Sequence, residues 1–284
     1  MNSKHFQKGF TLVEMAIVLA IIGVILGAIS VGKDLQRDAE HQKIYQKFVA
    51  GWKSAYDQYY SRMGVVLGDS QTAPTYTVNG NVVTLGGGVG TGAAANLNGA
   101  VAGVPANMQN AGRKICHGQG YAANTVGLGD AALEVNPNQD LHTLFDRAGI
   151  RMPAGRSEGQ EDRYLYLDSN GNPAEIQICF QWNSDGTNSG SGNVMVLRGL
   201  TPDLARMLDQ MIDGKADAIE GRFRQQDNTL NTNAANTSQQ AGIEWRANNT
   251  YNTTQQGAAG ASTTGDNQDE NRVLLVTAHW QMDQ

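Results

Sequence analysis

The side chain with the clearest chemical role is that of Glu14, a carboxylate inside an otherwise apolar run. Residues 10–31 read FTLVEMAIVLAIIGVILGAISV, and Glu14 is their only charged residue. A carboxylate in the middle of a bilayer costs about 2.5 to 3.5 kcal/mol on insertion scales, so this one requires a partner. Cutting the chain just before Phe10 would create a free amine, on the same subunit or on a neighbour, that can form the ion pair.

The apolar run is long enough to cross a membrane, because about twenty apolar residues form a helix that spans the hydrocarbon core. Lys4 and Lys8 precede it, and this basic flank keeps the N-terminus cytoplasmic. A secretory signal has a shorter apolar core and a small-residue cleavage site on its far side, which the sequence after Val31 lacks. We therefore expect the span to be retained. The alternative is a single-span anchor that is never processed.

The remaining titratable side chains show no arrangement typical of an enzyme. No Ser-His-Asp, His-Glu-x-x-His or paired-acid motif occurs, and a solvated loop explains Glu158 and Glu161. We therefore expect no catalytic activity. The five histidines are scattered along the chain, at His5, His41, His117, His142 and His279.

Two segments place oxygen side chains where they could hold calcium. Asp168, Asn170 and Asn172 alternate as in the first half of a calcium loop, but the carboxylate that completes an EF-hand is missing. A tight hairpin turn explains these residues equally well. Asp213 and Asp217, in a turn after a predicted helix, form the second candidate. Apart from calcium at these two segments, we expect no cofactor.

The two cysteines, Cys116 and Cys179, lie far apart in the sequence. Neither belongs to a Cys-x-x-Cys motif, so no zinc or thioredoxin-type motif is present. A disulfide between them is the natural interpretation if the head is exported. Closing a loop of that span stabilises a fold by about 4 kcal/mol on the chain-entropy model.

Composition limits both the partners and the number of domains. The chain has 284 residues and a net charge of −6, which suits one globular head beyond the membrane segment. The acidic balance disfavours nucleic acid as a partner, because affinity for phosphates comes from clustered Lys and Arg. Residues 228–271 are rich in Asn, Thr, Gln, Ala and Gly, so we expect a long polar loop there.

An amphipathic helix is predicted to continue the membrane segment. It extends to about Met63 and ends near Gly64, which gives a helix from Phe10 of about 80 Å. Charged residues fall on its other faces. The apolar positions recur at three- to five-residue intervals, at Leu35, Ala39, Ile44, Phe48, Trp52, Ala55 and Tyr59.

The head is predicted to be an antiparallel sheet packed on the amphipathic half of this helix, which is an α+β fold. A hairpin is expected over residues 76–85, around an Asn-Gly pair. A shorter helix begins at Thr201-Pro202 and is stopped by Gly214. The other strand candidates are residues 163–167, 175–182, 194–197 and 272–280.

The sequence Lys8-Gly9-Phe10-Thr11-Leu12-Val13-Glu14, followed by an unbroken apolar helix, resembles the N-terminus of type IV pilins. It is equally similar to the pseudopilins of type II secretion and DNA-uptake systems. The resemblance implies that a prepilin peptidase cuts after Gly9 and methylates Phe10. It also implies that Glu14 pairs with the N-terminus of a neighbouring subunit during assembly. Its specific part covers only residues 8–31.

The resemblance divides the chain into four parts. The leader peptide is residues 1–9, and the transmembrane or filament-core helix is residues 10–31. The amphipathic half of the helix covers residues 32–64. The globular α+β head, residues 65–284, includes the polar loop.

The resemblance further implies an inner-membrane protein that crosses once, with a cytoplasmic N-terminus and a periplasmic head, and that later joins an extracellular or periplasmic filament. Its expected partners are prepilin peptidase, the inner-membrane assembly platform, membrane lipid and other pilin-like subunits. Chain length favours a minor subunit, since major pilins are usually shorter. The alternatives are a pseudopilin of a type II secretion system and a tip module for adhesion or DNA uptake.

Overall fold

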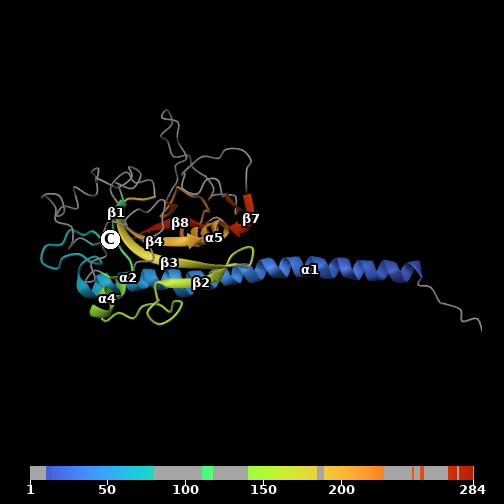
Figure 1. Cartoon of the computed structure of the whole chain (residues 1–284), viewed down its shortest axis with the longest axis horizontal. Coiled ribbons are helices and arrows are strands. Elements are labelled where there is room, and N and C mark those ends of the chain that lie inside the picture. The colour runs from blue at the N-terminus through green and yellow to red at the C-terminus, as the bar shows by residue number, and fades with distance from the viewer. Residues whose placement is uncertain are drawn as a thin grey trace, which may run out of the picture. The chain divides into compact units, whose positions relative to one another are not determined.

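The structure is a computed structural model, and it describes residues 11–79, 111–117, 140–183, 189–226, 245, 250–252, 268–273 and 275–283. Residues 1–9, the predicted leader peptide, and Phe10 lie outside the described residues. The chain, shown in Figure 1, separates into two compact units, Met1–Ile44 and Tyr45–Gln284.

Helices follow one another without a gap from residue 12 to residue 63. α1 spans Leu12–Ile44, the π-helix η1 spans Tyr45–Val49, and α2 spans Ala50–Met63. α2 ends at Gly64, whose φ of 73° is a left-handed conformation that glycine adopts without strain. The predicted long helix is therefore confirmed over its described residues, including its C-terminal end.

One antiparallel sheet forms the body of the second unit. Its strand order is β1-β3-β4-β8-β5, and β2 also pairs with β3, so that β1 and β2 bind different halves of the β3 strand. The α+β fold with an antiparallel sheet is therefore confirmed. The strands of this sheet are β1 (Ala111–Ile115), β2 (Arg163–Leu167), β3 (Pro173–Asn183), β4 (Gly192–Leu200), β5 (Phe223–Gln225) and β8 (Val276–Gln281).

Three of the strand predictions are confirmed, and the fourth is wrong as a single strand. β2 has the predicted bounds, while β3 and β4 extend beyond theirs. Residues 272–280 are divided between β8 and β7, Gln268–Val273. β7 pairs with β6, Thr250–Asn252, in a separate two-stranded sheet. The segment 228–271 is therefore not loop throughout.

A short helix that the sequence did not predict, α4, spans Leu141–Arg147. Asp140 caps its N-terminus, because one carboxylate oxygen accepts from the backbone N–H groups of His142 at 3.1 Å and Thr143 at 3.3 Å. With only seven residues, this helix shows too little periodicity to be read from the sequence.

The shorter predicted helix is confirmed as α5, Pro202–Asp213. Thr201 precedes it with an extended backbone, and proline occupies its first turn as expected. Gly214 ends it with a φ of 81°. Leu208 and Asp209 of this helix are fully buried.

Aromatic side chains from α2, α4 and the sheet form the centre of the head's core. Trp52 is fully buried, and its ring centroid lies 5.5 Å from that of Phe145 and 6.4 Å from that of Phe180. Tyr56 stacks on Phe180 at 5.0 Å. Figure 1 shows α2 lying along β3, the strand that carries Phe180. The predicted packing of the sheet on the amphipathic helix is thus confirmed for α2.

The buried stripe of the helix begins later than predicted. Leu35 is 64% exposed and Ala39 is also exposed, although the periodicity placed both of them in the stripe. The described part of the first unit, residues 11–44, consists of this helix and the residue before it. Nothing within residues 11–44 covers the two side chains.

The hairpin predicted over residues 76–85 is wrong in its described part, residues 76–79. Its first four residues form bends and a turn rather than a strand. The Asn193 side chain of β4 binds them, donating to the Tyr76 carbonyl at 3.0 Å and accepting from the Val78 N–H at 2.8 Å. These side-chain bonds replace the backbone ladder that a hairpin requires. Residues 80–85 of the predicted hairpin lie outside the described residues.

Candidate functional site

Thr11 and Glu14 form a reciprocal hydrogen-bonded cap at the start of α1. The Thr11 backbone N–H and hydroxyl donate to Glu14 Oε2, at 2.8 and 2.9 Å. In return, the Glu14 backbone N–H donates to the Thr11 hydroxyl oxygen at 3.3 Å. This arrangement is a capping box. The sequence signal for this box is Thr-x-x-Glu directly before an apolar run. Sequence reasoning interpreted Glu14 only as an ion-pair partner and missed the cap.

The segment that follows the cap carries its apolar side chains outward. Residues Leu12–Ile29 are long and apolar enough to cross a membrane, and none of them is buried within the chain. Leu12 is 91% exposed and Val24 is 74% exposed. An apolar surface of this size has to be covered by lipid or by other helices, because burial of such surface is favourable by about 25 cal/mol per Å². The segment is therefore a candidate membrane anchor.

The N-terminal residues also match a known family. Residues 4–30 match the model of the prokaryotic N-terminal methylation motif. The N-terminus is a type IV pilin-like prepilin signal. This motif supports a pilin-like or pseudopilin precursor. Comparison with curated proteins and with solved structures finds no match to the chain.

The prepilin signal is described only in part. Thr11 and Glu14 are in place at the start of α1, whereas Gly9 and Phe10 lie outside the described residues. Cleavage after Gly9 and methylation of Phe10 therefore stay predictions. The structure places Glu14, which is exposed, in the first turn of the apolar helix.

In the head, the first calcium candidate forms a tight turn between β2 and β3. One carboxylate oxygen of Asp168 accepts from the backbone N–H groups of Asn170 and Asn172, both at 2.8 Å. Gly171 completes the turn with a φ of 82°. The hairpin-turn interpretation accounts for these contacts. Calcium at Asp168, Asn170 and Asn172 stays a prediction.

The second calcium candidate is a structured turn that leads from α5 to β5. Asp213 Oδ2 accepts from the backbone N–H groups of Arg222 at 2.7 Å and Phe223 at 2.8 Å. Asp217 Oδ1 accepts from two further backbone N–H groups, and Lys215 Nζ lies 3.3 Å from its other oxygen. Among the residues that the structure describes, no group of three or more His, Cys, Asp or Glu could hold a metal. Calcium at Asp213 and Asp217 stays a prediction.

Asp209 is a buried acid next to this turn that sequence reasoning missed. Its Oδ2 accepts from Trp245 Nε1 at 2.9 Å and from the Asp217 backbone N–H at 2.7 Å. Burial raises the pKa of Asp209 to about 8, and these two hydrogen bonds offset only part of that effect. Its position directly after Leu208 on the apolar face of α5 is the signal that could have found it.

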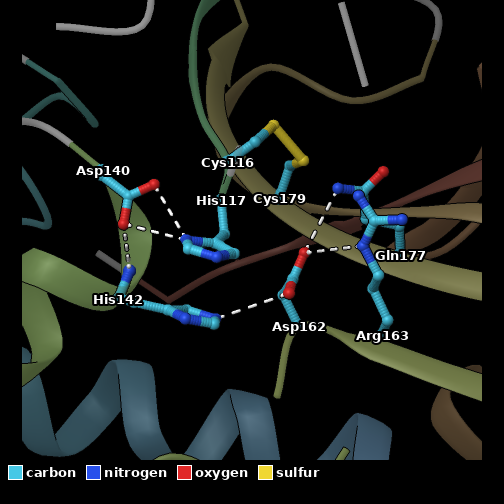
Figure 2. The surroundings of a disulfide bond; sticks show 8 residues. All are labelled: Cys116, His117, Asp140, His142, Asp162, Arg163, Gln177 and Cys179. Atoms are coloured by element: carbon cyan, nitrogen blue, oxygen red, sulfur yellow. Dashed lines mark hydrogen bonds and ion pairs between the residues drawn. A yellow bond between two sulfur atoms is a disulfide. The ribbon is translucent and has the colours of Figure 1, made fainter. Parts of the chain in front are cut away.

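The predicted disulfide joins Cys116 and Cys179, with 4.6 Å between their Cα atoms. Cys116 directly follows β1, and Cys179 lies in β3, so the bond links two neighbouring strands. Figure 2 shows the rings of His117 and His142 lying side by side near this bond, with carboxylates around them. These polar residues come from segments far apart in the sequence, so no spacing motif could have found them.

Proposed function

We propose that the chain is a structural subunit of a type IV pilus or a related filament, cleaved after Gly9 and methylated at Phe10. The observation that carries this proposal is the methylation motif on a helix whose apolar side chains face outward. A helix of this kind can move from lipid into a bundle of like helices without a change in fold. Such exchange is what filament assembly requires.

The capping box gives Glu14 a partner before assembly. In the single chain, the Thr11 N–H and hydroxyl satisfy one oxygen of its carboxylate. Cleavage after Gly9 leaves this box intact and creates a positively charged amine on Phe10. An amine from a neighbouring subunit then adds the opposite charge that the box lacks, and an ion pair in a low-dielectric surrounding is stronger than one in water.

The proposed partners follow from this sequence of steps. Prepilin peptidase processes the N-terminus, membrane lipid holds the uncleaved and cleaved subunit, and the inner-membrane assembly platform passes it to other pilin-like subunits. The N-terminus is cytoplasmic at first, because Lys4 and Lys8 precede the apolar segment. The head is periplasmic, and the subunit ends in an extracellular or periplasmic filament.

We further propose a minor rather than a major subunit. A chain of 284 residues with a glycine-rich head is easier to accommodate at a tip or at low copy number. Mass spectrometry of purified filaments tests this through the molar ratio of the chain to the most abundant subunit. A ratio near one would contradict a minor role.

Replacement of Gly9 tests the processing step. Gly9→Asp should leave the full-length protein in the membrane, visible as an unshifted band on a gel, when it is expressed with prepilin peptidase. Gly32→Ala is a suitable control, because a Cβ at Gly32 meets no atom within 4 Å and the position follows the motif. Normal maturation of Gly9→Asp would reject Gly9 as the cleavage site.

A pseudopilin of a type II secretion system shares the same motif and is the second candidate. It would form a short periplasmic filament and no surface filament. Immunogold labelling of intact cells separates the two, since only a surface filament exposes the head to antibody.

A tip module for adhesion or DNA uptake is the third candidate, and a gel shift at low salt tests its DNA-binding version. The acidic net charge of −6 disfavours that version.

A further inference from the structure

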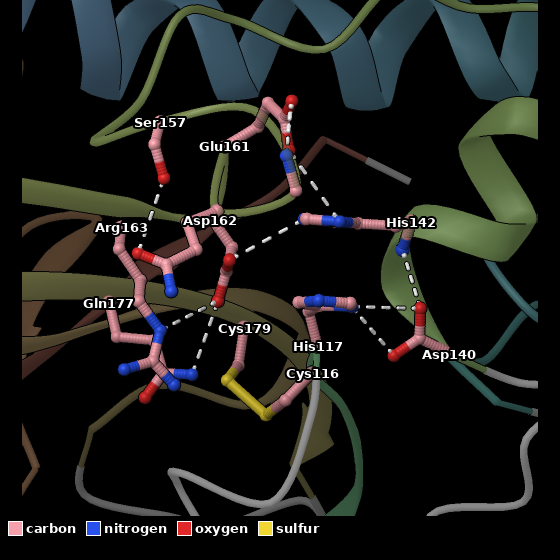
Figure 3. A network of polar contacts seen from close by, with 12 residues as sticks. Cys116, His117, Asp140, His142, Ser157, Glu161, Asp162, Arg163, Gln177 and Cys179 are labelled. Carbon is pink, nitrogen blue, oxygen red and sulfur yellow. Dashed lines mark hydrogen bonds and ion pairs between the residues drawn. A yellow bond between two sulfur atoms is a disulfide. The ribbon is translucent and has the colours of Figure 1, made fainter.

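Two histidine rings lie face to face next to the disulfide. His117 directly follows the first cysteine, and His142 lies in the first turn of α4. Their ring centroids are 3.6 Å apart, and the ring planes differ by only 5°. Figure 3 shows this pair between the carboxylate of Asp140 on one side and those of Glu161 and Asp162 on the other.

The ring of His142 lies between two carboxylates. Its Nδ1 is 3.6 Å from Glu161 Oε2, and its Nε2 is 3.4 Å from Asp162 Oδ1. Both oxygens and Nε2 are buried, and none of the three forms a hydrogen bond within the described part of the chain. Glu161 and Asp162 are consecutive residues before β2, so one loop presents both carboxylates to the ring.

These surroundings suit a protonated imidazole better than a neutral one. A neutral imidazole has one N–H and one lone pair, so it donates to one carboxylate and directs its lone pair at the other. An imidazolium carries an N–H on each nitrogen and can donate to both. A buried carboxylate oxygen without a donor is unfavourable, and protonation of His142 supplies the second donor that the neutral ring lacks.

A second buried histidine, His279, has the opposite surroundings. Its Nδ1 lies 3.0 Å from the Asn183 amide nitrogen, which is a donor. Its Nε2 lies 3.2 Å from the Gln226 side-chain oxygen, which is an acceptor. One donor and one acceptor match the lone pair and the N–H of a neutral imidazole. His279 is therefore a matched control within the same chain.

The other ring of the stacked pair, His117, faces the carboxylate of Asp140. His117 Nδ1 lies 3.0 Å from both oxygens of Asp140, and a neutral ring satisfies that contact by donating. Two imidazolium rings stacked at 3.6 Å would repel each other. Arg163 and the Gln177 amide both bind Asp162 Oδ2, at 3.8 and 3.2 Å, and this oxygen is not the one nearest the ring.

We propose that His142 is a proton-binding site that joins α4 to the loop before β2 at mildly acidic pH. Imidazole is the side chain that ordinarily changes charge between about pH 5 and pH 8. Protonation creates two ion pairs in the folded head that the unfolded chain lacks. The stabilisation by this site is therefore present at the acidic end of that window and is lost as the pH rises. This inference does not depend on filament assembly.

Thermal unfolding of the full chain in detergent micelles tests the proposal, with tryptophan fluorescence as the signal and EDTA present to remove metal ions. Between about pH 5.5 and pH 8, the Tm of the wild type should fall by about 2 to 4 °C more than that of His142→Gln. His41, whose pKa burial and Arg37 lower, contributes equally to both proteins. His279→Gln should keep the wild-type response.

Equal pH responses of the wild type and His142→Gln would overturn the proposal. Glu161→Gln is a second variant for the case that His142→Gln does not fold. Its side chain is 21% exposed, and its backbone carbonyl still accepts from Trp52 Nε1. It removes one of the two ion pairs, so its pH response should be about half that of the wild type. A full wild-type response in Glu161→Gln would equally overturn the proposal.

Discussion

The two compact units of this chain differ in the exposure of their apolar side chains. Leu12–Ile29 of α1 presents apolar side chains outward along its whole length. The head instead encloses Trp52, Phe145 and Phe180 completely. The head is therefore stabilised by its own contacts, whereas α1 requires lipid or other helices around it. This difference supports the proposal that α1 is the assembly element.

The units also differ in the hydrogen-bond partners and the exposure of their acidic side chains. Glu14 depends on one neighbouring residue, Thr11, and its carboxylate is exposed, so that a new partner can reach it. Asp209 is enclosed and bound by Trp245 and by a backbone N–H. A new partner can therefore bind the carboxylate of Glu14, whereas burial blocks access to that of Asp209.

Removal of the Glu14 carboxylate should have the largest effect on the assembly element. Glu14→Ala keeps Gly9 and Phe10, so we expect normal cleavage, but filament incorporation should fall by at least about tenfold because the neighbouring amine loses its ion pair. Immunoblots of sheared filaments against membranes measure this ratio. Glu40→Ala, an exposed position later in α1, is the control. Wild-type incorporation of Glu14→Ala would show that the carboxylate has no assembly role.

Removal of the central aromatic of the head should have the largest effect on stability. Trp52→Ala leaves a cavity beside Phe145 and Phe180 and should lower the free energy of unfolding by about 3 to 5 kcal/mol in urea titrations. Trp52→Phe keeps a ring and should lose less. N-terminal cleavage should be unaffected in both variants. A loss below about 1 kcal/mol for Trp52→Ala would contradict the core described above.

Asp209 tests how completely the head excludes water. Burial raises the pKa of Asp209 to about 8, so the folded head keeps a proton that the unfolded chain loses above about pH 4. This contribution to stability is complete below about pH 4 and is lost as the pH rises through about 8.

Asp209→Asn replaces the titratable carboxyl group with an amide, which stays neutral over this pH range. Between about pH 6 and pH 8, the free energy of unfolding of the wild type should therefore fall by about 2 kcal/mol more than that of Asp209→Asn, measured in urea titrations. Parallel pH curves for the two proteins would show that the carboxyl is solvated in the folded head.

The smallest expected effect concerns the cap. Thr11→Val removes the hydroxyl but keeps the backbone N–H that donates to Glu14. Loss of a cap residue typically lowers helix stability by an amount that corresponds to about a fivefold change in equilibrium, so we expect filament incorporation to fall about fivefold. Thr11→Ser keeps the hydroxyl and should behave as wild type. An effect as large as that of Glu14→Ala would mean that Thr11 does more than cap the helix.

The parts of the fold that could be predicted are those with local signals. The end of the long helix follows from Gly64, and α5 follows from Thr201-Pro202 at one end and Gly214 at the other. Glu14 stands out because one carboxylate interrupts a long apolar run. Each of these signals lies within a few residues of the feature that it predicts.

The parts that could not be predicted depend on contacts between distant segments. Leu35 shares the periodicity of the buried stripe but is exposed, because burial depends on where a covering layer exists. The stacked rings of His117 and His142 lie on two segments, one next to the disulfide and one in α4, that meet only in the folded head. The hairpin prediction fails at Tyr76 because Asn193, from a different strand, binds the backbone there. Sequence spacing carries no information on such contacts.

Mass spectrometry of the N-terminal peptide from cells that contain prepilin peptidase tests the central claim most directly. The account predicts a mature chain that begins at Phe10 with a single methyl group on its α-amine. A chain that keeps the leader peptide and carries no methyl group at Phe10 would contradict it.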